Sequence, residues 1–207
     1  MNLEKLFEAQ KKLDERIVKE KGLENEDLLD KRILALLVEL GELANEYRGF
    51  KFWSENQKPN TDVCDFCDGN KTVYAVNREL NISTPVKDCP VCRRSGKRDV
   101  NPLLEEYVDC LHFILSIGLE LGCTFNKIAK QKSRTVTLQF IDSFHATAIL
   151  FESIESDWDE DEKLENFENV VAGFLGLGEM LGFTWEQIEQ GYYEKNRINH
   201  GRQKNGY

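Results

Sequence analysis

The chain has 207 residues, with 27 Lys+Arg against 37 Asp+Glu, and its formal net charge is -10. This length suits one domain, or one domain that carries an insert. No apolar run reaches the roughly 18 residues of a membrane span, and residues 1–12 lack the apolar region of a secretory signal. We therefore expect a cytoplasmic protein that does not cross a membrane. We expect no binding to nucleic acid, because the net charge is negative and phosphates need a basic partner.

Helical periodicity flanks a central segment of different composition. Apolar spacing predicts helices over about 2–21, 28–48, 102–121, 135–155 and 162–181, and a sixth from about residue 184. Strand-like alternation is confined to Thr72–Val76, within a segment that is richer in proline, glycine and cysteine. The prediction is an all-α helical bundle built from 1–54 and 101–207, with a small inserted module, 55–100, between the second and third helices.

Two of the predicted helices carry acidic strips. The apolar stripe of the second helix leaves a narrow face that holds Glu39, Glu42 and Glu46. The third helix is apolar almost all round, and its polar strip includes Asp109, with Glu106 at the edge. A helix of this kind is buried, so its acids should face another buried strip or a cavity.

We predict that these two strips bind a divalent cation. The sets Glu39–Glu42 and Glu106–Asp109 supply four carboxylates, which suit Mg²⁺, with Mn²⁺ as a possible substitute. The plainer alternative is a pair of solvated acidic faces. A di-iron site also stays open, because His112 follows Asp109 by three residues.

Two C-x-x-C pairs lie in the central segment. They are Cys64, Cys67, Cys89 and Cys92. The repeated spacing predicts a tetrahedral site for a structural Zn²⁺, since a module with few large apolar side chains needs such a cross-link to fold. A redox-active cysteine pair and an iron–sulfur site are the alternatives.

The C-terminal segment from Lys195 to Tyr207 combines Lys and Arg with amide side chains and contains no acid. Such side chains bind phosphate oxygens well. A solvated basic tail at the end of a helix is the alternative, which the helix dipole would favour.

Taken together, these segments resemble the dimeric all-α dUTPase family, whose relatives are the MazG-type all-α NTP pyrophosphatases. The resemblance is carried by Leu6–Asp14, Glu39–Glu46, Phe50–Trp53, Glu105–Phe113 and the C-terminal segment. The cysteine module is a departure, because the common core of the family does not require it.

The resemblance implies a role for each matching residue. Gln10 would contact uracil, Trp53 would stack on the base, and His112 and Phe113 would lie near the deoxyribose. Further residues match the spacing of the family's C-terminal phosphate motif: Tyr193, Lys195, Asn196, Asn199, Arg202, Gln203, Gly206 and Tyr207.

The implied activity is Mg²⁺-dependent hydrolysis of dUTP to dUMP and pyrophosphate by a homodimer. Glu39 is the expected acceptor of the proton from the attacking water. Two other functions stay open. One is the same chemistry on another nucleotide, such as dCTP or a noncanonical one. The other is a zinc-dependent interaction protein without catalysis.

Overall fold

The computed structural model describes residues 3–64, 66–77, 82–123 and 128–204. Within these residues the chain forms six helices and a two-stranded hairpin. In chain order they are α1 (Leu3–Lys21), α2 (Leu29–Tyr47), β1 (Thr72–Asn77), β2 (Ile82–Asp88), α3 (Pro102–Glu120), α4 (Val136–Glu155), α5 (Glu160–Met180) and α6 (Trp185–Lys204). The all-α prediction is confirmed, and the six helices begin within about two residues of their predicted starts.

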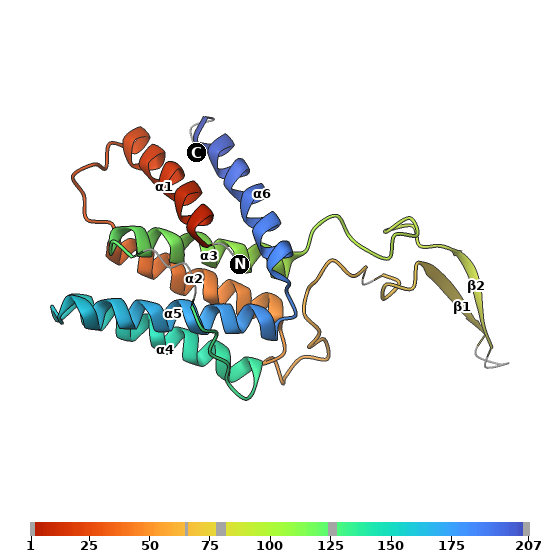
Figure 1. Cartoon of the computed structure of the whole chain (residues 1–207). Helices are drawn as coiled ribbons and strands as arrows, with labels where there is room; N and C mark the ends of the chain where they lie inside the picture. The colour runs from red at the N-terminus through yellow and green to blue at the C-terminus, as the bar shows by residue number, and fades with distance from the viewer. Residues whose placement is uncertain (1–2, 65, 78–81, 124–127, 205–207) are drawn as a thin grey trace.

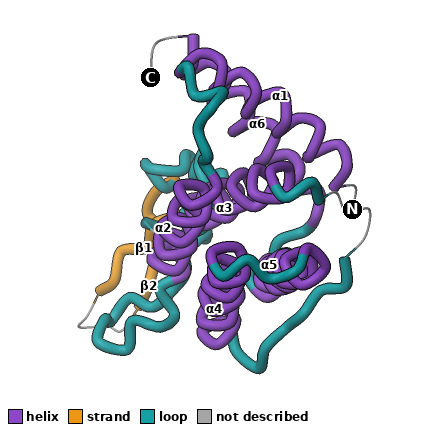
Figure 2. Tube along the Cα trace, turned by 90° about the vertical axis from the view of Figure 1, so that its left-hand side faces the viewer, coloured by secondary structure: helices purple, strands orange, loops and turns teal. Residues whose placement is uncertain are grey.

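The helices stack in three layers of two. Figure 1 shows α1 and α6 in one outer layer, α2 and α3 in the middle, and α4 and α5 in the other outer layer. Figure 2 shows the same arrangement from the side. The helix that sequence periodicity marks as apolar all round, α3, packs against α1, α2, α5 and α6, and its Tyr107 and Ile117 are fully buried.

The ends of these helices follow the local sequence. Asn101 caps α3, since its side chain accepts a hydrogen bond of 3.2 Å from the Leu104 N–H, and Pro102 occupies the first turn. Gly122 and Gly182 follow α3 and α5 in the left-handed conformation that glycine favours. At the end of α2 this conformation falls on Arg48 (φ 61°) rather than on Gly49.

The insert between α2 and α3 is an arm that projects from the bundle (Figure 1). It contains an antiparallel pair of strands, of which the sequence predicted only β1. The sequence pattern did not predict β2, because this strand contains Pro85, which cannot donate a backbone hydrogen bond. The register shifts between Val73 and Tyr74, and Pro85 pairs with Tyr74 at this irregularity, where proline is tolerated.

The base of the arm is tied to both of the acid-bearing helices. The Asn60 N–H and side-chain amide donate to the Glu46 backbone carbonyl (2.9 Å) and carboxylate (2.8 Å) at the end of α2. The Asn60 carbonyl accepts from the Leu103 N–H (3.0 Å) at the start of α3. Beyond this point the outgoing and returning chains pair through Val63 and Lys97. The ends of α2 and α3 are therefore joined independently of the outer arm.

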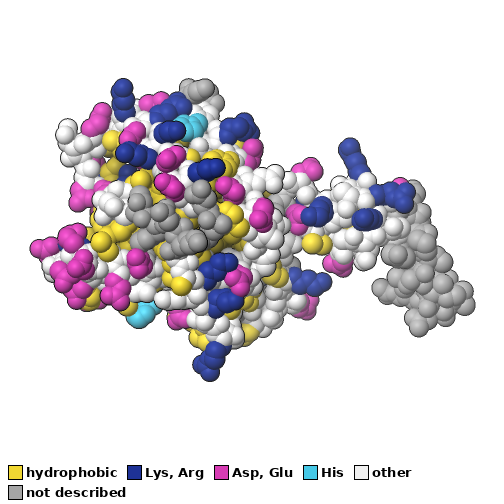
Figure 3. Space-filling view, viewed as in Figure 1, with side chains coloured by type: hydrophobic (Ala, Val, Ile, Leu, Met, Phe, Trp, Pro, Cys, Tyr) yellow, Lys and Arg dark blue, Asp and Glu magenta, His cyan; other side chains and the backbone are white. Residues whose placement is uncertain are grey.

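The arm carries basic side chains that are paired with acids. Lys97 contacts Asp62 (2.6 Å) and Arg94 contacts Asp88 (3.2 Å). The space-filling view shows Lys and Arg interspersed with Asp and Glu on this part of the molecule (Figure 3).

None of the helices in the described ranges has the length and apolar character that crossing a bilayer requires.

Candidate active site

A pocket of about 460 Å³ lies between α1, α2, α3 and α6. Seven residues that the resemblance assigns to the substrate line it: Gln10, His112, Phe113, Lys195, Asn199, Arg202 and Gln203. The predicted metal ligands Glu39 and Asp109 also line it. The tertiary structure thus brings together residues from four helices that are far apart in the sequence.

One end of the pocket is acidic. Carboxylate oxygens of Glu39, Glu42 and Glu106 all lie within 4.8 Å of one another. Burial raises the pKa of Glu106 to about 7, and the neighbouring carboxylates of Asp109, Glu39 and Glu42 add to the shift. The pKa of Glu39 is raised for the same reasons, with burial first. Carboxylates crowded in this way are the donor set that a hard divalent cation stabilises.

Asp109 does not belong to this group of three, although it lies beside it. Lys195 Nζ is 2.5 Å from Asp109 Oδ2 and 3.5 Å from Glu105 Oε1. Burial raises the pKa of Asp109, and the hydrogen bond and charge of Lys195 oppose the shift. The fourth predicted oxygen ligand is therefore engaged by a lysine from α6.

The other end of the pocket is organised by Gln10, which is only 3% exposed. Its Nε2 donates to Asp14 Oδ1 (2.8 Å) and Ser116 Oγ (3.0 Å). Its Oε1 accepts from the Tyr192 hydroxyl (2.9 Å) and from His112 Nδ1 (2.7 Å). All four positions of the amide are used, so a direct contact of Gln10 with a base would require one of these bonds to open.

Two acceptor atoms beside Gln10 have no partner among the described residues. Since Gln10 Oε1 only accepts, His112 Nδ1 carries the proton, and Nε2 presents a lone pair. Burial lowers the pKa of His112 to about 3, with help from the charge of Lys195, so the ring is neutral. The two atoms are His112 Nε2 and Asp14 Oδ2, which are buried and form no hydrogen bond within the part of the chain that the structure describes. Both residues line the pocket and suit a ligand that donates hydrogen bonds.

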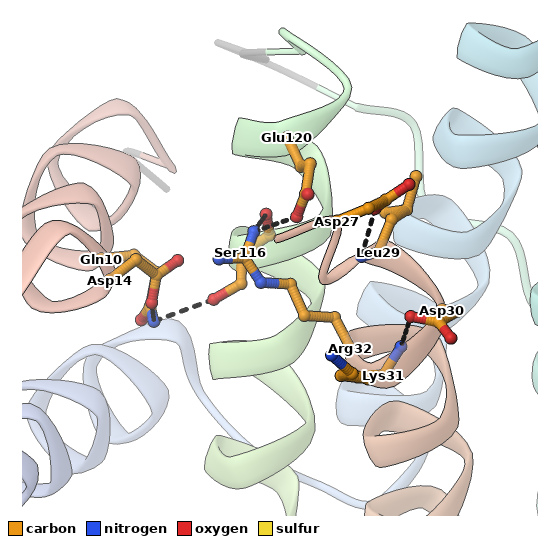
Figure 4. A network of polar contacts seen from close by, with 9 residues as sticks. All are labelled: Gln10, Asp14, Asp27, Leu29, Asp30, Lys31, Arg32, Ser116 and Glu120. Carbon is orange, nitrogen blue, oxygen red and sulfur yellow. Dashed lines mark hydrogen bonds and ion pairs between the residues drawn. The ribbon is translucent and has the colours of Figure 1, made fainter. Parts of the chain in front are cut away.

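A cation closes this end of the pocket. Figure 4 shows Arg32 of α2 reaching across to Glu120 and Ser116 of α3, close to Gln10 and Asp14. The Arg32 guanidinium donates to the Glu120 carboxylate and to the Ser116 carbonyl (3.3 Å). Arg32 and Glu39 both line the pocket and lie seven residues apart on α2, which separates them by about 10 Å.

Sequence reasoning did not single out Asp14, Ser116 or Arg32 as part of the site. The positions of Asp14 and Ser116 in the sequence nevertheless indicate that they belong to the site. Asp14 lies one helical turn after Gln10, and Ser116 lies one turn after His112 on the polar strip of α3. A search of each helix face around the predicted residues would have found both. Arg32 carried no comparable signal, because only the packing of α2 against α3 shows where its side chain lies.

Three described residues that the resemblance assigns to the substrate do not line this pocket. Trp53 follows the far end of α2, is 65% exposed, and packs edge-on against Phe50 and Phe52. Tyr193 and Asn196 line a separate groove between α1 and α6. Gly206 and Tyr207 lie outside the described residues. The roles of these five residues stay predictions.

The four cysteines of the arm meet in one cluster. Their sulfurs all lie within 4.8 Å of one another, and the Cys64–Cys89 and Cys67–Cys92 distances are 3.8 and 3.6 Å. These distances are far longer than a disulfide bond. They match the roughly 3.8 Å edge of a tetrahedron with metal–sulfur bonds of about 2.3 Å. The cluster lies between α2 and α3, as predicted, and its donor set fits a metal ion.

Comparison with known proteins identifies the relationship of the chain. A family model described as dUTPase matches residues 2–77 and 93–207, which is nearly the whole chain. The chain belongs to this dUTPase family. The internal segment that the family model does not match, 78–92, falls inside the arm and includes two of the four cysteines. No curated protein matches the chain significantly. Membership in the dUTPase family supports a role in nucleotide hydrolysis.

Proposed function

We propose that the protein hydrolyses dUTP to dUMP and pyrophosphate with Mg²⁺. The observation that carries the proposal is one pocket with an acidic end, at Glu39, and a polar end that offers unpartnered acceptors, at His112 and Asp14. Along α2, Glu39 at the acidic end and Arg32 beside Gln10 and Asp14 are about 10 Å apart, which suits a nucleotide with its phosphates at one end and its base at the other (Figure 4). Family membership supports the same assignment.

Glu39, Glu42 and Glu106 would hold the cation, with Asp109 as a fourth ligand. The raised pKa of Glu106 supports the fit, because burial and the neighbouring carboxylates both disfavour its charged form, which a bound cation would stabilise. When bound, Mg²⁺ supplies charge stabilisation at the phosphates and acidifies a water. Glu39 lines the pocket, and its raised pKa suits it to accept the proton of that water.

The phosphates would be bound by α6. Lys195 and Arg202 face the pocket together with Asn199 and Gln203. The Arg202 guanidinium is 3.4 Å from Asn199 Oδ1, which orients it along the helix. These side chains would stabilise the charge that develops on the phosphate oxygens during hydrolysis.

We propose that Gln10 holds His112 and Asp14 in position to receive donors from the substrate. Uracil offers its N3–H and the deoxyribose its 3′-hydroxyl, and both groups donate. The exocyclic amine of cytosine donates as well, so the two unpartnered acceptors also favour dCTP as a second candidate. Phe113, which lines the same pocket, is the candidate contact for the sugar.

We also propose that the chain acts as a homodimer. Leu34 and Val38 lie one turn apart on α2 and are 63% and 51% exposed, beside the acidic face. Because Trp53 lies away from the pocket of its own chain, it would stack on a base only in the pocket of a second copy.

For the cysteine cluster we propose a structural Zn²⁺. Four thiolates in tetrahedral geometry are the ligands that zinc prefers. The Gly96 N–H donates to Cys92 Sγ (3.3 Å), which stabilises a thiolate at this position. With all four positions taken by protein ligands, the site would be closed to substrate.

The decisive experiment is pyrophosphate release from each dNTP, with and without Mg²⁺. We expect Mg²⁺-dependent release, fastest from dUTP. Glu42→Gln should cut turnover on the order of 100-fold or more, because it removes a charged ligand. Glu46→Gln is the matched control, since Glu46 lies on the same helix but bonds to Asn60 outside the group of three.

Each other result excludes part of the proposal. Preference for dCTP would replace the substrate and keep the chemistry. Near-wild-type turnover in Glu42→Gln would refute the metal assignment. The absence of Mg²⁺-dependent turnover on every nucleotide would instead favour a zinc-dependent interaction protein without catalysis.

A further inference from the structure

The ion pair of Lys195 with Asp109 lies at the point where the predicted metal site is incomplete. Lys195 Nζ is 2.5 Å from Asp109 Oδ2, and both side chains are largely shielded from water, with exposures of 13% and 17%. The three other predicted ligands gather without Asp109. An ion pair so shielded is weakened little by salt, so it competes effectively with a metal ion for the carboxylate.

Besides Asp109 and Glu105, Lys195 has a candidate partner in the substrate. It lines the pocket beside Arg202, on the side where the phosphates of a nucleotide would lie. A phosphate group offers several oxygens and more charge than a single carboxylate, and it would compete with Asp109 for the ammonium group. Once Lys195 turns to a phosphate, Asp109 is left beside Glu39 and Glu106 without its partner.

We propose that the Lys195–Asp109 ion pair is a latch that keeps Asp109 from the metal until the phosphates of a substrate draw Lys195 away. This inference rests on the proposed function, because it takes Asp109 as a ligand of the cation. Lys195 is then a positioning residue for the metal site as well as a phosphate contact. By linkage, phosphate binding and metal binding strengthen each other to the same extent.

The latch makes a prediction about metal binding in the absence of any nucleotide. Mn²⁺ serves as the probe, and its binding to the full-length, zinc-loaded protein is followed by the loss of the free-ion EPR signal. Lys195→Met should tighten Mn²⁺ binding by about tenfold, the usual size of coupling between groups in direct contact. Lys195→Gln should behave alike, and circular dichroism establishes that both variants are folded.

Two comparisons separate the latch from a general effect of charge. Lys31→Met removes a lysine that lines the same pocket but pairs with Glu26, so Mn²⁺ binding should change less than about twofold. In an Asp109→Asn background, Lys195→Met should also change binding less than about twofold, because the latch no longer has its carboxylate.

Each remaining outcome contradicts either the latch or the proposed function. The latch is wrong if Lys195→Met leaves the Mn²⁺ affinity unchanged. It is also wrong if Lys195→Met tightens Mn²⁺ binding equally in the Asp109→Asn background, or no more than Lys31→Met does. If the wild-type protein binds no Mn²⁺ and releases no pyrophosphate from any nucleotide, the proposed function fails and the latch fails with it. Turnover measured on the same wild-type sample distinguishes failure of the latch alone, in which turnover is retained, from failure of the proposed function, in which it is absent.

Discussion

At Glu106, burial and charge act in the same direction. Removal from water raises the pKa of its carboxyl group to about 7, and the carboxylates of Asp109, Glu39 and Glu42 add to the effect. The folded protein therefore holds a proton at Glu106 more tightly than the unfolded chain does, for which the reference pKa is 4.5. As the pH rises from that value through 7, the contribution of this proton to stability is lost.

The direction of this pH dependence leads to a prediction for the stability of the protein without added Mg²⁺. Glu106→Gln should become progressively more stable than the wild type as the pH rises from about 4.5 to above 7, because the amide cannot acquire the repelled charge. Urea denaturation at a series of pH values measures the difference. Added Mg²⁺ should weaken the pH dependence of the wild type. A stability difference that is the same at every pH would contradict the assignment.

At the scale of elements, the arm and the helices are stabilised in different ways. The helices bury apolar side chains such as Leu36 and Leu111 in one continuous core. In the arm, the buried cluster consists of the four cysteines, with Val73 packed against it. Val63, Phe66 and Val91 are exposed instead. A module with such a small apolar core depends on its cross-link for folding.

Substitution of the cysteines therefore tests whether the proposed Zn²⁺ is structural and separate from the proposed catalytic Mg²⁺. Replacing Cys64 and Cys67 by Ser should abolish zinc binding and disorder the outer arm. Most of the helical content should remain, because the Asn60 hydrogen bonds that join α2 to α3 need no zinc. Zinc analysis, far-UV circular dichroism and turnover together measure these effects. Cys123→Ser is the control, since this thiol lies outside the cluster.

Residual turnover decides the interpretation of the cysteine variant. We expect some activity to survive, since no proposed ligand of Mg²⁺ comes from the arm. If the variant keeps its helical content and its Mn²⁺ binding but loses all turnover, the arm belongs to the active site. The separation of a structural zinc from a catalytic magnesium would then be wrong.

For the whole molecule, the exposed apolar residues of α2 predict a second copy. Leu34→Glu combined with Val38→Glu should place charge in the proposed dimer interface and yield monomers at micromolar concentration. Sedimentation velocity measures the change. Val91→Glu, on the projecting arm, is the control and should leave the dimer intact. A wild-type monomer with full activity would contradict the proposal.

The sequence by itself determined the order of the helices, the position of the insert and the grouping of the cysteines. These features depend on local rules. The apolar spacing of α3 predicts its burial, Asn101 and Pro102 predict where it begins, and the spacing of Cys64 and Cys67 predicts a pair of ligands. The same periodicity placed Glu39 and Glu42 on one face of α2, and the structure brings them together with Glu106.

Only the tertiary structure decided which side chains share the pocket. Gln10 is saturated by partners from three helices, and Lys195 engages Asp109 across 86 positions of sequence. Trp53 lies away from the pocket although it belongs to the same family pattern. The physical reason is that helical periodicity defines the face of a residue on its own helix. Packing against other helices determines which atom that face meets, and whether a predicted ligand is already engaged by a neighbour.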